Sequence, residues 1–247
     1  MRRRFQRRVI LWAGLWLACG AAFASGLQVA PVSLTIKAKE SAEGLWLSNT
    51  GDNVVHAQVR AYHWTQEGGA DALTASRGLV ISPPMLQLAA SERQLVRAIR
   101  LGAPPSGAGA VEDAYRVIID ELPVDSEGKK GLNFVLRYSV PVFVEPAGAP
   151  ASAPQLQWAL HREGDKTVLD VSNSGGTHAQ VADLSYTDAG GHRTDVAKGL
   201  LGYVLPGAQM HWAVKAPAAA LAGGGSWEAM INGTTAPQTI SLADRAR

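Results

Sequence analysis

Residues 131–146 read GLNFVLRYSVPVFVEP, a stretch in which apolar side chains recur at every second position. Side chains two residues apart in a β-strand point to the same face of a sheet, so the pattern predicts a strand with one apolar face. Pro141 has no N–H for a neighbouring strand, which places the predicted strand at a sheet edge. Because a long apolar edge is an aggregation hazard, we expect this edge to bind a strand of another protein. The alternating residues are Leu132, Phe134, Leu136, Tyr138 and Val140.

Short alternating runs of the same kind recur along the rest of the chain. They are separated by turns rich in Gly, Asn, Pro and Ser, and no segment keeps a helical period over three turns. Short strands at this spacing are typical of β-sandwiches. The sequence therefore predicts an all-β protein built from immunoglobulin-like sandwiches. The runs include residues 45–47, 54–64, 93–101, 114–122, 167–173 and 178–186.

The N-terminus has the features of a cleaved secretory signal peptide at residues 1–24. Five of its first eight residues are arginine, the next ten residues are apolar, and Ala22-Phe23-Ala24 fits an A-x-A cleavage site. The apolar run is too short to span a bilayer as a helix. We therefore expect the mature chain to be exported and to start near Ser25.

Removal of this segment changes the charge and the cysteine content. It carries five arginines and no acidic residue, so 18 basic residues remain against 21 acidic ones and the net charge becomes −3. The basic pI of the full chain thus gives no indication of nucleic-acid binding. Cys19, the only cysteine, also lies in the segment, so packed cores rather than disulfides must stabilise the mature chain. A lipoprotein signal at residues 17–20 is the alternative interpretation, although Trp16 stands where a small aliphatic residue is expected.

A connector rich in Pro, Ala and Gly divides the mature chain. We predict a first immunoglobulin-like domain at residues 25–147, a linker at 148–155 and a second domain at 156–247. A short internal repeat accompanies this division. The sequence Ser-Asn-Thr-Gly at 48–51 with His-Ala-Gln-Val at 56–59 recurs as Ser-Asn-Ser-Gly at 172–175 with His-Ala-Gln-Val at 178–181. The repeat predicts two similar sandwiches that share an early hairpin; chance matching in an alanine-rich chain is the alternative.

Motifs for catalysis or for metal binding are absent from the sequence. There is no G-x-S-x-G, H-E-x-x-H, P-loop or complete G-x-G-x-x-G motif. The paired carboxylates at 112–113 and 120–121 are neighbours in predicted strands and point to opposite faces, so they are poor acid/base partners. We expect no enzymatic activity, no cofactor and no metal, and we assign the six histidines to surfaces and hairpins. These histidines are His56, His63, His161, His178, His192 and His211.

The tryptophans admit two interpretations. Trp46 and Trp64 lie in alternating strands and are most simply explained by packing in the core or between sheets. Trp158, Trp212 and Trp227 are also assigned to packing, because no patterned polar residues surround them. The alternative is that they stack on a sugar.

The order of these features resembles the periplasmic pilus-assembly chaperones of chaperone–usher systems, the PapD-like proteins. The specific elements are Ser82-Pro83-Pro84, the Leu-Val-Arg at 95–97, the Asp-Glu-Leu-Pro at 120–123 and the alternating strand itself. The resemblance covers nearly all of the predicted first domain, whereas the second domain agrees only in size and β pattern. The matching stretches are residues 45–64, 79–101, 115–123 and 132–146.

The resemblance implies both a fold and a function. The fold is two immunoglobulin-like sandwiches in an L-shaped arrangement with a cleft between them. The function is to bind incomplete pilus or fimbrial subunits in the periplasm by donor-strand complementation and to deliver them to an outer-membrane usher. A free chaperone of this kind is also expected to self-associate and so hide its edge. By resemblance, the side chains donated to the subunit are Leu132, Phe134, Leu136 and Tyr138.

The residues that would anchor the subunit depart from the common pattern of the family. Many members hold the subunit's C-terminal carboxylate with basic residues at the positions occupied here by Ser33 and Pro141, neither of which can pair with it. The chain is therefore similar to the divergent, archaic branch of the family. Arginine suits this role because a guanidinium can bind both carboxylate oxygens. Arg116 is the first candidate anchor, because it shares a strand face with Ile118 and is expected near the cleft end of the domain; Arg97 and Arg137 follow. The alternative is that these arginines are solvated or form ion pairs within the domain, which are worth about 0–1 kcal/mol when exposed.

Two other classes of function stay open from the sequence. A tandem immunoglobulin-like adhesion module would recognise glycan through exposed tryptophans such as Trp158 or Trp227. An envelope hydrolase would need a nucleophile–base pair assembled across strands, and no such pair is visible.

Overall fold

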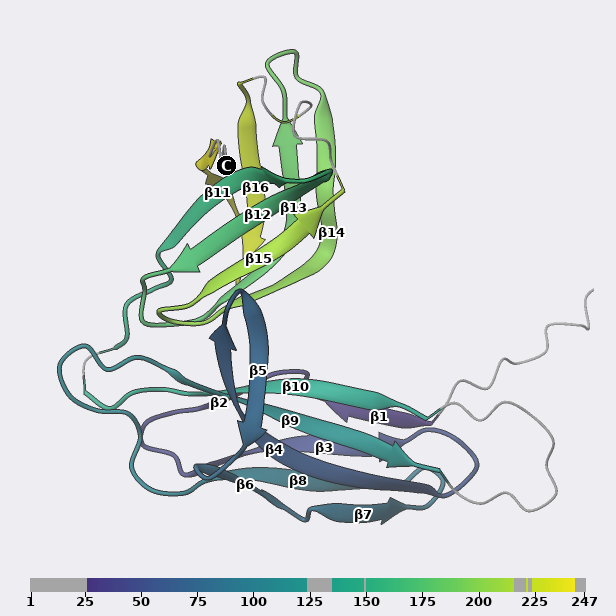
Figure 1. Ribbon diagram of the computed structural model, residues 1–247. Coiled ribbons are helices and arrows are strands. Elements are labelled where there is room, and N and C mark those ends of the chain that lie inside the picture. Colours follow the sequence, from purple (N-terminus) through teal and green to yellow (C-terminus); the bar gives the residue numbers. More distant parts are fainter. Residues whose placement is uncertain (1–25, 124–134, 149, 216–220, 222–223, 243–247) are drawn as a thin grey trace, which may run out of the picture.

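The computed structural model describes residues 26–123, 135–148, 150–215, 221 and 224–242 (Figure 1). Two sheets are built from residues between 27 and 144 and two from residues between 156 and 242, so the predicted all-β fold of two sandwiches is confirmed. The two sandwiches form the arms of an L (Figure 1). The predicted signal peptide lies outside the described residues, and no helix within them is long and apolar enough to cross a membrane.

The first sandwich pairs a four-stranded sheet A with a six-stranded sheet B. Sheet A contains, in spatial order, β1 (Leu27–Ala30), β3 (Ala42–Asn49), β8 (Arg93–Arg100) and β6 (Leu79–Ser82). Sheet B contains β2 (Leu34–Ile36), β10 (Arg137–Val144), β9 (Asp113–Leu122), β4 (Val55–Glu67) and β5 (Ala70–Ala75), with β7 (Met85–Leu88) paired to the start of β4.

The second sandwich consists of two four-stranded sheets. Sheet C contains β15 (Gln209–Val214), β12 (Lys166–Asn173), β11 (Leu156–Glu163) and β18 (Ile240–Leu242). Sheet D contains β14 (Arg193–Val204), β13 (Ala179–Thr187), β16 (Ser226–Ile231) and β17 (Thr234–Gln238).

Alternation along β9 determines which side chains fill the first core and which face outward. Tyr115, Val117 and Ile119 are buried in the core between sheets A and B. Since neighbouring strand residues point to opposite faces, Arg116 and Ile118 lie on the outer face of sheet B. The same rule puts Tyr138, Val140, Val142 and Val144 of β10 on the core side.

The internal repeat corresponds to a buried asparagine at the end of β3 and of β12. The Asn49 amide donates to the carbonyl oxygens of Asn53, Leu88 and Ala89 at 2.7–3.1 Å. The Asn173 amide donates in the same manner to the carbonyls of Thr177 and Val204 at 2.8 and 3.1 Å. The prediction of a shared early hairpin is wrong, because in each domain the chain passes from one sheet to the other at this turn. The asparagine is repeated because it satisfies buried carbonyls where the chain leaves a sheet.

The roles assigned to the aromatic residues and histidines are partly confirmed. Trp158 and Trp227 are buried in the second core and Trp212 packs against it, as predicted. Trp46 is 39% exposed on sheet A, so its assignment to the core is wrong; it faces outward because Leu45 and Leu47 take the core side of β3. Trp64 is buried between the domains rather than inside a sandwich. His161 and His178 are also more enclosed than surface histidines, because Asp170 and Glu112 lie against them.

Candidate functional site: an open sheet edge and the interdomain cleft

The prediction that this strand lies at a sheet edge holds only for the first half of β10, since β2 rather than β10 is the outermost strand of the sheet. Residues Val142–Val144 pair in parallel with β2, so the edge is closed in the second half. Over Arg137–Pro141 the described strands pair with β10 on the β9 side alone. The N–H of Glu121 donates to the carbonyl of Leu136 at 2.9 Å, which directs the peptide groups of even-numbered residues toward β9. The peptide groups of Arg137 and Ser139 therefore point to the open edge, as does the ring nitrogen of Pro141.

This open edge lies beside β1, the edge strand of the opposite sheet. The Tyr138 hydroxyl donates to the Leu27 carbonyl at 2.5 Å and so connects the two edges. Burial raises the pKa of Tyr138 further above neutral pH, and the hydroxyl is therefore a hydrogen-bond donor. Val29, Leu136 and Tyr138 pack partly buried against the first core at this side of the sandwich. The arrangement leaves an apolar seam between two free strand edges.

The structure describes two of the four predicted donor residues. Leu136 and Tyr138 lie on the core side, at the seam. Leu132 and Phe134 lie outside the described residues. Val135, which the alternation assigns to the other face, is 52% exposed.

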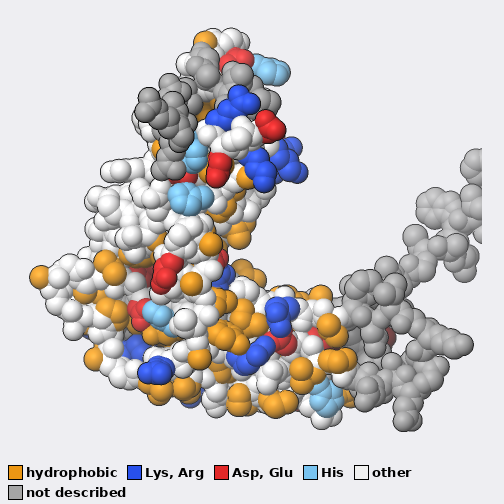
Figure 2. Space-filling view, viewed as in Figure 1, with side chains coloured by type: hydrophobic (Ala, Val, Ile, Leu, Met, Phe, Trp, Pro, Cys, Tyr) orange, Lys and Arg blue, Asp and Glu red, His pale blue; other side chains and the backbone are white. Residues whose placement is uncertain are grey.

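The second part of the site is the cleft between the arms, which appears as a hollow in the surface of the molecule (Figure 2). Arg116 projects into it from the outer face of sheet B, directly beside Pro141 in the β9–β10 pairing. Its Cζ atom lies 3.7 Å from the ring centroid of Trp64 in β4 and 5.1 Å from that of Tyr203 in β14. A ring from each domain thus holds the guanidinium by cation–π contact.

The charge of Arg116 is only partly compensated. Burial lowers the pKa of this guanidinium, while Asp71 and the Tyr203 hydroxyl oppose that shift. No carboxylate within the described chain approaches Arg116 closely enough for a salt bridge. A half-buried arginine with free donors in a concave site is suited to bind a carboxylate from a partner.

The two other candidate anchors lie elsewhere. Arg137 is bound to Asp120, which also accepts from the Arg60 guanidinium at 2.5 Å. Burial acts to raise the pKa of Asp120, but the hydrogen bonds from the two arginines outweigh it and hold the pKa below its usual value. Arg97 is exposed on β8 of sheet A, whereas Arg116 belongs to sheet B. The structure therefore does not bring the three arginines together.

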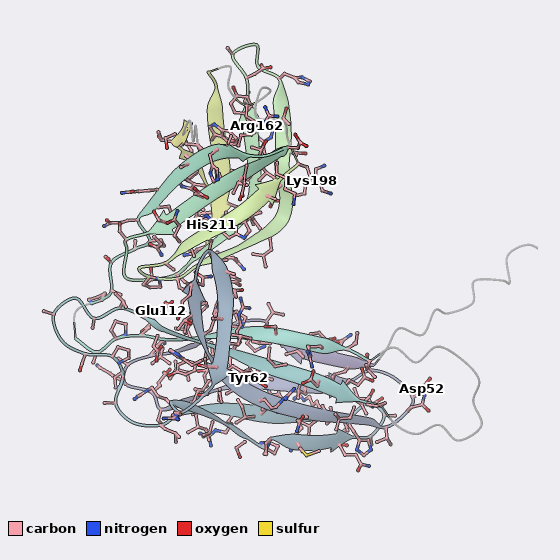
Figure 3. The ribbon with its side chains drawn as sticks, in the orientation of Figure 1. Asp52, Tyr62, Glu112, Arg162, Lys198 and His211 are labelled. Atoms are coloured by element: carbon pink, nitrogen blue, oxygen red, sulfur yellow. The ribbon has the colours of Figure 1, made fainter. Side chains whose placement is uncertain are left out.

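Residues of the second domain close the elbow of the L. His178 stacks on Phe143 of β10 with ring centroids 3.5 Å apart. Its Nδ1 lies 2.8 Å from Glu112, and its backbone N–H donates to the same carboxylate oxygen at 3.2 Å. Figure 3 labels Glu112 at this elbow. Together with the Trp64–Tyr203 contact, these residues connect the two domains at the bend.

An exposed apolar pair lies on the outer face of sheet A. Trp46 and Leu95 are directly opposite each other in the β3–β8 pairing, and each is 39% exposed. The Arg93 guanidinium covers part of the indole, 4.6 Å from the ring centroid. The sequence did not predict this pair, because every outward-facing strand residue alternates with core residues and alternation alone does not mark a binding surface. The available signal was that Trp46 is out of phase with Leu45 and Leu47.

The described part of the chain contains no cluster of three His, Cys, Asp or Glu residues suited to a metal ion.

Residues 26–150, just over half of the chain, match the family described as pili and flagellar-assembly chaperones, PapD N-terminal domain. The chain belongs to this chaperone family. Its members are assembly chaperones rather than enzymes, and the match includes both the open edge of β10 and Arg116.

Solved structures of other pilus chaperones have the same fold as this chain. It is similar to the chaperone in a complex of CsuC with the tip adhesion subunit CsuE, from the archaic chaperone–usher Csu pili of Acinetobacter baumannii. That similarity has 23% identity and a TM-score of 0.69, and covers 88% of this chain and 99% of the other. The chaperone DraB of E. coli is 17% identical, with a TM-score of 0.58 and coverage of 88% and 97%. The CupB2 chaperone of Pseudomonas aeruginosa is also 17% identical, with a TM-score of 0.58 and coverage of 87% and 100%. No curated protein matches the sequence.

Proposed function

We propose that this chaperone binds an incomplete pilus or fimbrial subunit in the periplasm by lending it the alternating strand of residues 131–146. The observation that carries the proposal is the free edge of β10 over Arg137–Pro141, with an apolar seam beside it. A subunit that lacks one strand could add its own strands along this edge and cover the side chains of the seam. Main-chain hydrogen bonds would supply affinity, and the alternating side chains would supply register.

The anchor of the subunit in this proposal is Arg116. The cleft brings its guanidinium next to the line of β10, at the level of Pro141, where the edge becomes closed by β2. A subunit strand that runs along the open edge would end at this point. Its C-terminal carboxylate would then meet a guanidinium that has no other carboxylate partner in the described chain. The archaic Csu complex and the SafA pilin–SafB complex of Salmonella enterica are solved examples in which a similar fold holds a subunit.

We further propose that the usher binds the Trp46–Leu95 pair. This pair lies on the outer face of sheet A, on β3 and β8, whereas the seam lies at the edge formed by β1 and β10, so a subunit added at that edge would leave the outer face exposed. Exposed apolar pairs at strand centres are suited to a protein partner.

The free edge of β10 would pair with a second copy of the chaperone when no subunit is present, and this self-association would end when a subunit binds.

Periplasmic co-expression of the chaperone with its subunit and usher tests these assignments together. We expect a 1:1 chaperone–subunit complex on size exclusion and fibres on the cell surface. The double substitution Trp46→Asp with Leu95→Asp should leave the 1:1 complex intact and abolish the fibres, because only the docking surface is changed.

Leu200→Asp is the matched control, since Leu200 is an exposed apolar residue of the second domain. It should leave both the complex and the fibres unchanged. Normal fibre assembly by the Trp46/Leu95 variant would exclude this pair as the usher surface. Failure of the unsubstituted chain to retain any subunit would contradict the chaperone assignment.

A further inference from the structure

The hairpin formed by β4 and β5 extends beyond sheet B and reaches the second domain. In Figure 1 it stands upright from the first arm and ends beneath β15. At its tip, Gly69 forms an isolated parallel bridge with Met210, and the His211 N–H donates to the Gly69 carbonyl at 3.3 Å. Figure 3 labels His211 just above this tip. The hairpin is therefore an element of the first domain that contacts a sheet of the second.

Gln66 makes the most specific of these contacts. Its amide nitrogen donates to the Tyr203 carbonyl at 2.8 Å, and its amide oxygen accepts from the Leu205 N–H at 2.8 Å. Both ends of one side chain are thus bound to the backbone of the other domain. Asp71, across the hairpin, accepts from the Gln66 amide and from the Trp64 indole N–H, both at 2.9 Å. Asp71 thereby fixes the orientation of both residues.

These contacts lead directly to Arg116. Trp64 belongs to the hairpin and Tyr203 to the second domain, and their rings meet edge to face with centroids 5.5 Å apart. Arg116 lies against both rings. Because Gln66 binds the backbone of Tyr203, it fixes the position of the Tyr203 ring beside Arg116. Domains joined by a short linker otherwise move relative to each other.

We propose that the β4–β5 hairpin is a strut that sets the angle between the domains, and that Gln66 is a positioning residue that holds Arg116 in place through Tyr203. The role assigned to Arg116 rests on the proposed function. The strut itself is a property of the free chaperone and is testable without a subunit.

The tip of the strut offers a matched pair of substitutions. Gly69 has φ +81°, and a Cβ atom there would lie 1.7 Å from Cδ2 of His211. Gly68 has φ +60°, and a Cβ atom there would meet nothing within 4 Å. Alanine at either position carries the cost of a positive φ, but only at Gly69 does its Cβ also collide with the His211 side chain of the second domain.

The experiment is NMR spectroscopy of the free chaperone, combined with small-angle X-ray scattering. Ring currents from Trp64 and Tyr203 should displace the Arg116 Nε–H resonance, which is assigned by its loss in Arg116→Lys. Gln66→Ala and Gly69→Ala should each remove the part of the displacement that Tyr203 causes, while the part caused by Trp64 of the same domain remains. Both variants should also broaden the distribution of interdomain distances. Gly68→Ala and Gln58→Ala should change neither measurement; Gln58 lies on the same strand, where it is paired with Met85 and Asp120 inside sheet B.

Far-UV circular dichroism establishes that both domains remain folded in each variant. If the Arg116 resonance position and the scattering profile are both unchanged in Gln66→Ala and Gly69→Ala, the strut is excluded. If Gly68→Ala has the same effect as Gly69→Ala, strain in the turn rather than contact with His211 is responsible, and the proposal fails. Loss of subunit capture by the unsubstituted chain would contradict the proposed function and leave these results unaffected.

Discussion

Replacing Arg116 with alanine is expected to weaken the chaperone–subunit complex by about 2–5 kcal/mol, since a desolvated charge pair would lose one partner. The free arginine already lies against two rings and carries part of the desolvation cost before the subunit arrives. Much of the loss would come from the subunit carboxylate, which would be left in the cleft without a partner. Biolayer interferometry with the purified subunit measures the change, and we expect it mainly in the dissociation rate.

Two further substitutions separate the role of the planar guanidinium from that of its positive charge. Arg116→Lys keeps a cation but loses the planar guanidinium, so it should give an intermediate affinity. Arg97→Ala removes an exposed arginine from the opposite sheet and should leave the affinity unchanged. An unchanged dissociation constant for Arg116→Ala would remove this residue from the site, and a loss in Arg97→Ala would place the anchor on sheet A.

The triple substitution of Leu132, Phe134 and Leu136 by serine should abolish subunit capture. Each of these side chains, moved from water into an apolar groove, contributes roughly 1.5–3 kcal/mol, so their combined loss exceeds what main-chain pairing can offset. Co-purification of the subunit from the periplasm measures capture. The variant should stay folded, because the main core lies deeper in the sandwich and Leu136 is only partly buried at its rim.

Val135→Ser is the matched control for this substitution. Val135 is apolar, belongs to the same segment and is 52% exposed on the face opposite the donor side chains. Capture should persist in this variant. Persistent capture by the triple variant, or equal loss in the control, would show that alternation does not determine binding.

Local alternation explains why much of the fold could be predicted from the sequence. The side chains of β9 and β10 reach the core at every second position, and Pro141 indicated a free edge that is present only in the first half of β10. The pairing of β2 with the second half of β10 was not predictable, because three residues carry little pattern and the partner lies about 100 residues away in the chain. The repeated asparagine was visible, yet its turn connects two sheets rather than two paired strands.

The contacts between side chains in the cleft could not be predicted from the sequence. Arg116 was placed on the correct face by the period of β9, but nothing local indicated that Trp64 and Tyr203 would lie against it. Those contacts depend on the angle between the domains. That angle depends in turn on a glutamine and a glycine at a hairpin tip, residue types that sequence patterns assign simply to a turn.

Hydrogen exchange at the open edge is the most direct test of strand donation. The peptide N–H groups of Arg137 and Ser139 point away from β9, whereas those of Tyr138 and Val140 are already directed toward it. We predict that binding of a subunit slows exchange at Arg137 and Ser139 and leaves Tyr138 and Val140 unchanged. Unchanged exchange at Arg137 and Ser139 in a stable complex, with new protection on another surface, would show that the subunit is held elsewhere.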